Sequence, residues 1–137
     1  MSQHTPNRHA YEPASFAEML GTEKVASSDG WAMVRMPIRP RHRQGAGSVQ
    51  GGLIVALADL AFSSALGTLL MPGQRSVTVE LKVNFIAPAS QGELVAEGRI
   101  THKGNTLAVG EMTVTDGSGT LIAKGLGTWM ILRPRQG

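Results

Sequence analysis

The stretch from Gly51 to Leu70, GGLIVALADLAFSSALGTLL, decides how the rest of this chain can fold. At 1.5 Å per residue it is long enough for a helix of about 30 Å. Its apolar residues fall all round the helix, which is the pattern of a helix buried on most sides. Asp59 is its only charged residue. An isolated buried carboxylate is costly unless it is paired, protonated or used, so Asp59 is the first candidate for a functional role.

The same stretch is not a membrane span. Besides Asp59 it carries two serines and a threonine, and it begins with two glycines, whereas a span needs about 20 predominantly apolar residues. Nothing else in the chain resembles a span, so we expect no membrane partner.

The length and composition predict one domain. A chain of 137 residues can bury a sizeable core, and we place a single domain over residues 15–137 after a flexible polar segment, 1–14. The absence of cysteine excludes disulfides, thiolate metal sites and a cysteine nucleophile. The N-terminus, MSQHTPNRHA, lacks the basic and apolar regions of a secretory signal, so we expect a cytoplasmic location.

The charge pattern leaves two interpretations open. The net charge is +3, and basic residues gather between Arg35 and Arg43 and at Arg133 and Arg135. They are not interleaved with aromatic residues, as a surface for single-stranded nucleic acid would need, so we expect no nucleic-acid partner. The clusters are either a solvated loop and tail or a device that steers an anionic ligand, such as a small molecule with phosphate groups.

Short-period patterns surround the predicted helix. Apolar and polar residues alternate from Val77 to Phe85, which is the clearest strand pattern in the chain. Near Val109 and Gly110 the apolar positions change parity, which favours a bulge or a strand buried on both faces. Ser15 to Leu20 is predicted as a short helix that Gly21 ends. The predicted strands are 24–26, 31–38, 77–85, 93–101, 106–115 and 120–132.

These elements indicate an α+β fold. The last three strands are joined by short turns and form an antiparallel meander. A long apolar helix followed by such a sheet predicts that the curved sheet wraps round the helix. One helix covers only one face of a sheet. The other face or an edge then needs a second copy of the chain, so we expect at least a homodimer.

Residues suited to acyl chemistry gather on the helix. Ser63 lies four positions after Asp59 and shares its helix face. Gly51 stands at the predicted N-terminus, where N–H groups are unpaired and the dipole favours negative charge. Gln44 lies in the loop before that end. A carboxylate, a hydroxyl and hydrogen-bond donors for an oxyanion are the groups that an acyl-transfer site needs. Each also has a structural interpretation: a buried hydrogen-bonding Asp59, a packing Ser63, and glycines that permit a close approach of backbones.

Three stretches carry a resemblance to a known family. They are QGAGSVQGGLIVALADLAFSSALG, SVTVELKVNFIAPASQGELVAEGRI and HKGNTLAVGEMTVTDGSGTLIAKGLGTW. Over roughly residues 24–132 the chain resembles the hotdog-fold acyl-CoA thioesterases of the PaaI (phenylacetate degradation) type, in the 4-hydroxybenzoyl-CoA thioesterase-like superfamily. The resemblance implies a hotdog fold, a long central helix wrapped by a curved antiparallel β-sheet.

The resemblance also implies roles for individual residues. Gln44, the N–H of Gly51 and Asp59 match the catalytic positions of that family. Thr78 aligns with a Ser or Thr that positions the hydrolytic water. Ser63 matches the helix hydroxyl of the 4-hydroxybenzoyl-CoA thioesterases.

Two further groups are expected to bind substrate. Gln50 stands where the family motif usually has His, and we expect it to line the site with Gly52. The resemblance assigns the nucleotide end of coenzyme A to the turn formed by Lys103, Gly104, Asn105 and Thr106. It implies no cofactor and no metal. It also implies a site shared between chains of a homodimer or of a homotetramer, a dimer of dimers.

The sequence therefore predicts a thioesterase that hydrolyses a small or aromatic acyl-CoA. In this hypothesis Asp59 either attacks the carbonyl or activates water. The alternative is a non-catalytic hotdog protein that binds acyl-CoA, which the departure at Gln50 favours. A hotdog dehydratase ranks lower, because it needs a His paired with the acid, and neither His42 nor His102 lies at the motif.

Overall fold

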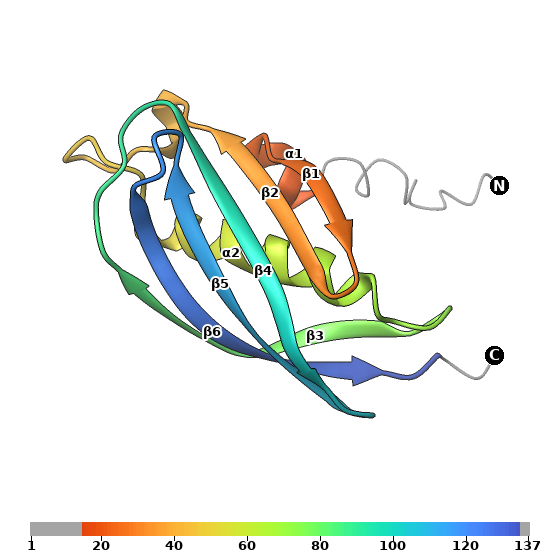
Figure 1. Ribbon diagram of the computed structural model, residues 1–137. Coiled ribbons are helices and arrows are strands. Elements are labelled where there is room, and N and C mark those ends of the chain that lie inside the picture. Colours follow the sequence, from red (N-terminus) through yellow and green to blue (C-terminus); the bar gives the residue numbers. More distant parts are fainter. Residues whose placement is uncertain (1–14, 135–137) are drawn as a thin grey trace, which may run out of the picture.

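The computed structural model describes residues 15–134, which form one long helix, two short helical segments and a six-stranded sheet (Figure 1). The predicted flexible segment 1–14 and Arg135 lie outside the described residues. The elements are α1 (Phe16–Leu20), β1 (Glu23–Ser28), β2 (Trp31–Pro37), η2 (Pro40–His42), α2 (Gly51–Gly67), β3 (Arg75–Phe85), β4 (Glu93–Lys103), β5 (Leu107–Asp116) and β6 (Leu121–Leu132).

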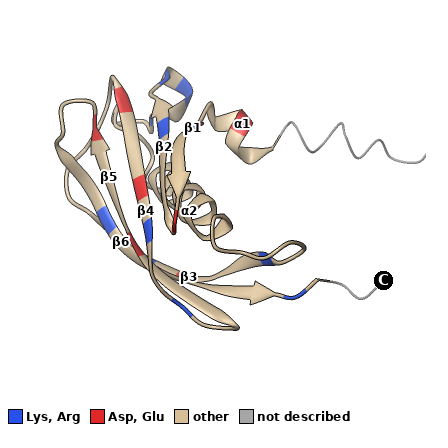
Figure 2. Ribbon diagram, turned by 45° about the vertical axis from the view of Figure 1, so that its right-hand side comes forward, with Lys and Arg blue, Asp and Glu red and all other residues tan. Residues whose placement is uncertain are grey.

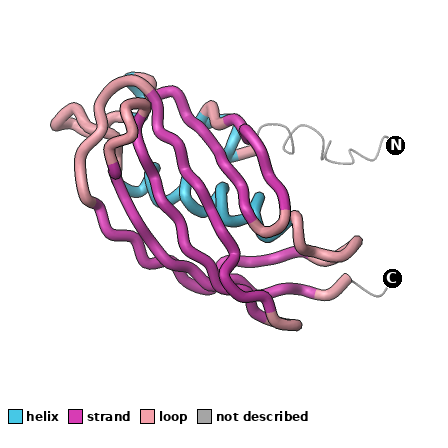
Figure 3. Tube along the Cα trace, viewed as in Figure 1, coloured by secondary structure: helices cyan, strands magenta, loops and turns pink. Residues whose placement is uncertain are grey.

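The sheet is antiparallel throughout, with strand order β1-β2-β4-β5-β6-β3. Strands β4, β5 and β6 form the predicted meander. Strand β3 follows α2 in the chain but pairs with β6, so it forms one edge of the sheet. Figures 1 and 3 show the sheet curving round α2 and leaving its other face uncovered. The α+β prediction is confirmed.

Helix α2 packs directly on the sheet. A Cβ atom on Gly98 of β4 would lie 2.9 Å from the backbone of Ala61, and one on Gly110 of β5 would lie 2.8 Å from Cε1 of Phe62. Real Cβ atoms essentially never approach so closely, so only glycine permits this contact. The Phe62 ring packs on Trp129 of β6, with centroids 4.0 Å apart and planes tilted by 49°. Both rings are almost fully buried.

The helix differs from its prediction in length and in burial. It ends at Gly67 rather than Leu70. The Thr68 hydroxyl donates to the Ala65 carbonyl and accepts from the N–H of Gly30, each at 2.7 Å, and this ties the helix end to the β1–β2 turn. The prediction of burial on most sides holds in a weaker form. Only Gly52, Ser63 and Gly67 of the helix are exposed and seven residues are half-buried, while the fully buried residues form a single stripe. That stripe is Ile54, Leu57, Ala58, Ala61, Phe62, Ala65 and Leu66.

The predicted bulge lies on the neighbouring strand. The pairing of β4 with β5 shifts between Ile100 and His102, so the extra residue is Thr101 of β4, opposite Val109. On β5 the even-numbered residues from Ala108 to Val114 are buried or half-buried throughout. Leu107 and Val109 are instead exposed. The parity change in the sequence therefore reflects apolar residues on the uncovered face of the sheet.

His42 is the only fully buried polar or charged residue among residues 15–134. Its Nδ1 accepts from the N–H of Arg39 at 2.9 Å, so Nε2 carries the ring proton and donates to the Leu20 carbonyl, also at 2.9 Å. Its own carbonyl accepts from the N–H of Gln50. The neutral ring therefore ties α1 to the segment that leads into α2. Desolvation by burial lowers the pKa of His42.

We predict that Gly98→Ala destabilises the protein, because the added methyl group meets the backbone of Ala61 rather than a movable side chain. Overpacking of this kind costs about 1–3 kcal/mol, which urea unfolding measures. Gly45→Ala is the control. Nothing lies within 4 Å of its Cβ position, so the free energy of unfolding should change by less than about 0.5 kcal/mol. Equal effects in the two variants would contradict the close approach of α2 to the sheet.

We predict that His42 makes stability depend on pH. Its pKa in the folded state lies below the ordinary value of about 6.5, so the unfolded chain binds the proton more readily. The stabilisation is then fully present above about pH 6.5 and is lost as the pH falls towards the lowered folded-state pKa. Thermal midpoints between pH 5 and 8 measure this loss. His42→Gln should be less stable at pH 8 but should lose less on acidification; parallel curves would exclude His42 as the cause.

Candidate active site

Asp59 and Thr78 form a hydrogen-bonded pair between α2 and β3. Thr78 lies opposite the inward-facing Trp129, so its side chain points towards the helix. The Thr78 hydroxyl donates to Oδ1 of Asp59 at 2.9 Å. No other hydrogen bond to this carboxylate is present within residues 15–134, and Oδ2 remains uncommitted. Asp59 is half-buried rather than enclosed, so its carboxylate is accessible at the protein surface.

Ser63 does not join this pair. It is exposed on the face of α2 one turn beyond Asp59, as the spacing predicts. In the described part of the chain its hydroxyl makes no hydrogen bond to the Asp59 carboxylate. In this geometry the hydroxyl that contacts the Asp59 carboxylate is that of Thr78.

A cavity of about 420 Å³ opens at the N-terminus of α2. Gln44, Gln50 and Gly51 line it together, so three of the expected site residues meet there. Across residues 15–134, the N–H groups of Gly51 and Gly52 take part in no hydrogen bond. Gln50 is the N-cap residue, but its side chain makes no capping bond. The cavity therefore offers the unpaired N–H of Gly51 and a free amide. Gly52, which was expected to line the site with Gln50, is exposed and does not line this cavity.

Gln44 is partly committed within its own loop. Its Nε2 donates to Oγ of Ser48 at 3.0 Å, and its Oε1 accepts from the N–H of Ala46 at 2.7 Å. The second hydrogen on Nε2 remains for a ligand, because an amide nitrogen carries two. These two bonds hold the side chain at the rim of the cavity.

The two halves of the expected site stand apart within one chain. Asp59 follows Gly51 by eight residues, which is about 12 Å along a helix, and Asp59 does not line the cavity. The chain therefore holds a donor site at the start of α2 and a carboxylate site further along the helix. Within one chain these two sites do not meet.

The turn expected to bind the nucleotide lies at the other end of the molecule. Thr106 lies next to β6, because its carbonyl accepts a hydrogen bond from the N–H of Ile131. Leu132, which follows Ile131 in β6, pairs with Arg75 at the start of β3. The turn therefore lies near the start of β3, whereas Phe85, at the end of β3, lines the cavity. An 11-residue strand spans about 35 Å. Within one chain, the group Lys103, Gly104, Asn105 and Thr106 therefore does not reach the cavity. Figure 1 shows the turn between β4 and β5 at the end of the sheet away from the start of α2.

The basic residues between Arg35 and Arg43 largely serve structure. Arg35 lies between Glu23 and Glu93, at 3.0 and 3.5 Å. Arg41 donates to the Met19 carbonyl and Arg43 to the Ser90 carbonyl. Figure 2 shows that the Lys and Arg positions (blue) and the Asp and Glu positions (red) are interspersed along the strands of the sheet. These contacts favour the interpretation of this cluster as a solvated loop.

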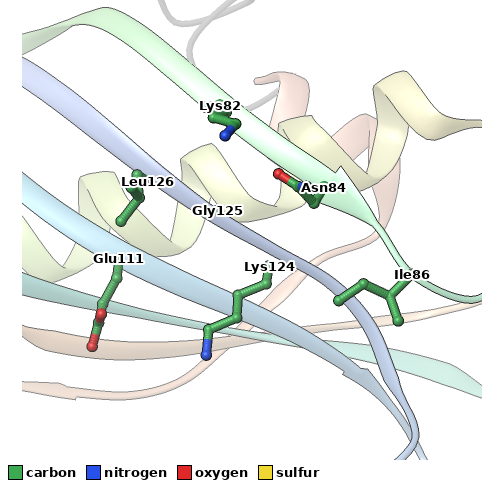
Figure 4. A pocket seen from close by; sticks show the side chains of 7 residues that line it. All are labelled: Lys82, Asn84, Ile86, Glu111, Lys124, Gly125 and Leu126. Carbon is green, nitrogen blue, oxygen red and sulfur yellow. The ribbon is translucent and has the colours of Figure 1, made fainter.

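Another cavity, of about 410 Å³, lies on the uncovered face of the sheet over β3, β5 and β6 (Figure 4). It contains none of the expected site residues. Its walls are Lys82, Asn84, Ile86, Glu111, Lys124, Gly125 and Leu126. It offers no Asp59, no hydroxyl and no helix N-terminus, so it is not the candidate active site.

Phe85 and Ile86 are cavity residues that the sequence analysis did not select. Both line the cavity at the start of α2 and are more than half exposed, at 56% and 54%. The available signal was two large apolar residues at the end of a strand, shortly before Pro88.

Two further observations bear on the chemistry. Between residues 15 and 134, no group of three or more His, Asp or Glu side chains is placed to hold a metal ion. No helix in this range is long and apolar enough to cross a membrane.

Comparison with known proteins identifies the family. The family model described as the thioesterase superfamily matches residues 46–123, and the chain belongs to this superfamily. A Saccharolobus solfataricus protein named "Putative esterase SSO2140" is 32% identical over 86% of this chain and 84% of its own. The acyl-coenzyme A thioesterase PaaI of Escherichia coli is 29% identical over 80% of this chain and 78% of its own.

Solved structures confirm the fold. The E. coli PaaI structure superposes with a TM-score of 0.82 at 25% identity, covering 93% of this chain and 92% of that chain. The conserved protein PA5202 of Pseudomonas aeruginosa superposes with a TM-score of 0.82 at 33% identity, covering 86% and 94%. The hotdog prediction is therefore confirmed, with one central helix against a six-stranded antiparallel sheet.

We predict that the protein is a homodimer or a dimer of dimers. Large apolar side chains remain exposed on the edge strand β3 and on the uncovered face, among them Val77, Val79, Leu107, Leu126 and Met130. Exposed edges and apolar patches favour pairing with another chain. Light scattering at micromolar concentration should give about two or four times 14.5 kDa.

Val79→Lys tests the edge directly, because a lysine on an edge strand opposes pairing. Val79 is 54% exposed, so the change should weaken association while the chain stays folded. If the wild-type protein is a monomer with full activity, the predicted interface and the shared site are both wrong.

Proposed function

We propose that this protein is an acyl-CoA thioesterase, which hydrolyses a small or aromatic acyl-CoA to the free acid and coenzyme A. The observation that carries the proposal is the hydrogen bond from Thr78 to Asp59. It fixes one carboxylate oxygen and leaves the other free on an accessible helix face. That is the arrangement a nucleophile or general base requires.

In the proposed mechanism, the start of α2 binds the thioester carbonyl. The unpaired N–H of Gly51 and the remaining amide hydrogen of Gln44 donate to the carbonyl oxygen and stabilise its developing negative charge. Oδ2 of Asp59 then attacks the carbonyl carbon or takes a proton from an attacking water. Thr78 holds the carboxylate in orientation. In both routes the C–S bond breaks and the sulfur leaves as the coenzyme A thiolate. When water attacks, its oxygen becomes part of the free acid, and the proton taken up by Asp59 passes to the thiolate. When Asp59 attacks, a mixed anhydride forms, and a water molecule then hydrolyses it to the free acid, restores the Asp59 carboxylate and supplies the proton for the thiolate.

The proposed site is completed by a second copy. Strand β3 is an edge strand, and a two-fold axis through it would pair the β3 strands of two chains antiparallel. Such pairing sets the half of β3 that holds Thr78 beside the partner half that ends at Phe85. The carboxylate of one chain then approaches the Gly51 cavity of the other, which the separation along α2 prevents within one chain.

The names of relatives support an acyl-CoA substrate. Besides PaaI, a Listeria monocytogenes relative is named 1,4-dihydroxy-2-naphthoyl-CoA hydrolase, and it is 28% identical over 72% of this chain and 80% of its own. Both names describe hydrolysis of a coenzyme A thioester. The dehydratase alternative loses support, because both ring nitrogens of the buried His42 are engaged.

A non-catalytic acyl-CoA-binding protein is the second candidate. Gln50 favours it, since a neutral amide donates a hydrogen bond but does not titrate near neutral pH as His does. An assay that follows thiol release over a panel of acyl-CoAs separates the two. Tight binding without thiol release would establish the binding protein.

We predict that Asp59→Asn abolishes most of the activity. The asparagine can still accept from Thr78 through its amide oxygen, so the fold is retained, but it is neither a base nor a nucleophile. A positioned general base contributes roughly 10²- to 10⁴-fold, and kcat should fall by at least about 10²-fold. The measurements are kcat, the Kd for acyl-CoA and the thermal midpoint, with the last two largely unchanged.

Gln50→Ala is the companion variant for this experiment. Gln50 lines the cavity at the start of α2 but has no assigned chemical role, so Gln50→Ala should change KM or substrate preference more than kcat. Normal turnover by Asp59→Asn would show the mechanism to be wrong. If Asp59→Asn fails to fold, Asp59 is a structural residue. The activity of Thr78→Val, which removes only the hydrogen bond to Asp59, would then test whether the pair contributes to turnover.

A further inference from the structure

The ring of Phe85 packs against Gly51 at the first residue of α2. A Cβ atom placed on Gly51 would lie 3.3 Å from Cζ and 3.4 Å from Cε1 of that ring. This is tighter than most contacts of real Cβ atoms, so the ring packs directly against the Gly51 backbone. The N–H of Gly51 is the proposed carbonyl donor. The aromatic ring and that donor are therefore immediate neighbours.

The backbone that carries Phe85 is held firmly. Phe85 ends β3 and pairs with Ala123 of β6. The next two N–H groups, of Ile86 and Ala87, both donate to the carbonyl of Ile122, at 2.8 and 3.2 Å. The side chain nevertheless remains 56% exposed and lines the cavity. The chain thus presents an aromatic side chain to the cavity from a firmly held stretch of backbone.

We infer that Phe85 determines which acyl groups the site accepts, favouring a flat, unsaturated group over a saturated group with the same number of carbons. This inference rests on the proposed function. A thioester whose carbonyl accepts from the Gly51 N–H has its acyl substituent within contact distance of the Phe85 ring, because ring and donor adjoin. Aromatic groups gain stacking energy beyond the burial of their area. A saturated ring gains only burial.

Benzoyl-CoA and cyclohexanecarbonyl-CoA are a matched pair for the test. They have the same carbon count and differ in flatness and π electrons. The measurement is the ratio of their kcat/KM values. The wild type should prefer benzoyl-CoA, and Phe85→Leu should reduce that preference by about 2- to 10-fold. Phe85→Tyr keeps the ring and should keep the preference.

Phe16→Leu is the control. Phe16 is 55% exposed on α1 and does not line the cavity, so its loss should leave the ratio unchanged. If Phe85→Leu slows both substrates equally, Phe85 only supports Gly51 and the inference is overturned. An unchanged ratio without any loss of rate overturns it as well.

The same assay tests the proposed function separately from the inference about Phe85. If the wild type releases no thiol from these two substrates or from the wider panel of acyl-CoAs, the thioesterase proposal fails. The inference is then decided by calorimetric Kd values for the same two acyl-CoAs. A binding preference for benzoyl-CoA that falls in Phe85→Leu supports it, and a preference that is absent or unaffected overturns it.

Discussion

The direct contact between the backbone of α2 and the sheet is the constraint on which the rest of the structure depends. Gly98 and Gly110 permit it, and side chains at either position would push the helix outwards. Protein interiors are close-packed, so such a displacement is transmitted rather than absorbed. The Phe62–Trp129 contact would loosen. So would the hydrogen bond that joins Thr78 on the sheet to Asp59 on the helix, which makes the candidate site dependent on the geometry of the core.

Features set by neighbouring residues were predictable from the sequence. The hydroxyl of Ser15 accepts from the N–H of Glu18, and Gly21 takes a φ of 77°, so α1 begins and ends where its local signals indicate. The meander followed from alternating residues and from short turns. The start of α2 at Gly51 was also correct, since a glycine pair after a glycine-rich loop is a local signal.

Features set by distant contacts were not predictable. The end of α2 depends on Thr68 meeting Gly30, and the position of the β4 bulge depends on the register with β5. In the candidate site, helix spacing predicts the distance between Asp59 and Gly51 along α2. The contact between Asp59 and Thr78 is not predictable in this way, because it arises from the pairing of β3 with β6. His42 carried no pattern in the sequence, because its partners, Leu20 and Arg39, meet it only in the folded chain.

The topology of the sheet also sets an order of assembly. Strand β3 takes its hydrogen-bonding partner from β6, the last strand of the chain, and all of β4 and β5 lie between them (Figure 1). Synthesis proceeds at about 5–20 residues per second. Until β6 has been synthesised, β3 therefore remains unpaired with its apolar edge exposed. The strand that carries Thr78 is fixed against the helix only when the final residues arrive. Nascent chains that stop before Leu121 hold the carboxylate of Asp59 but lack the β6 partner that fixes Thr78 beside it.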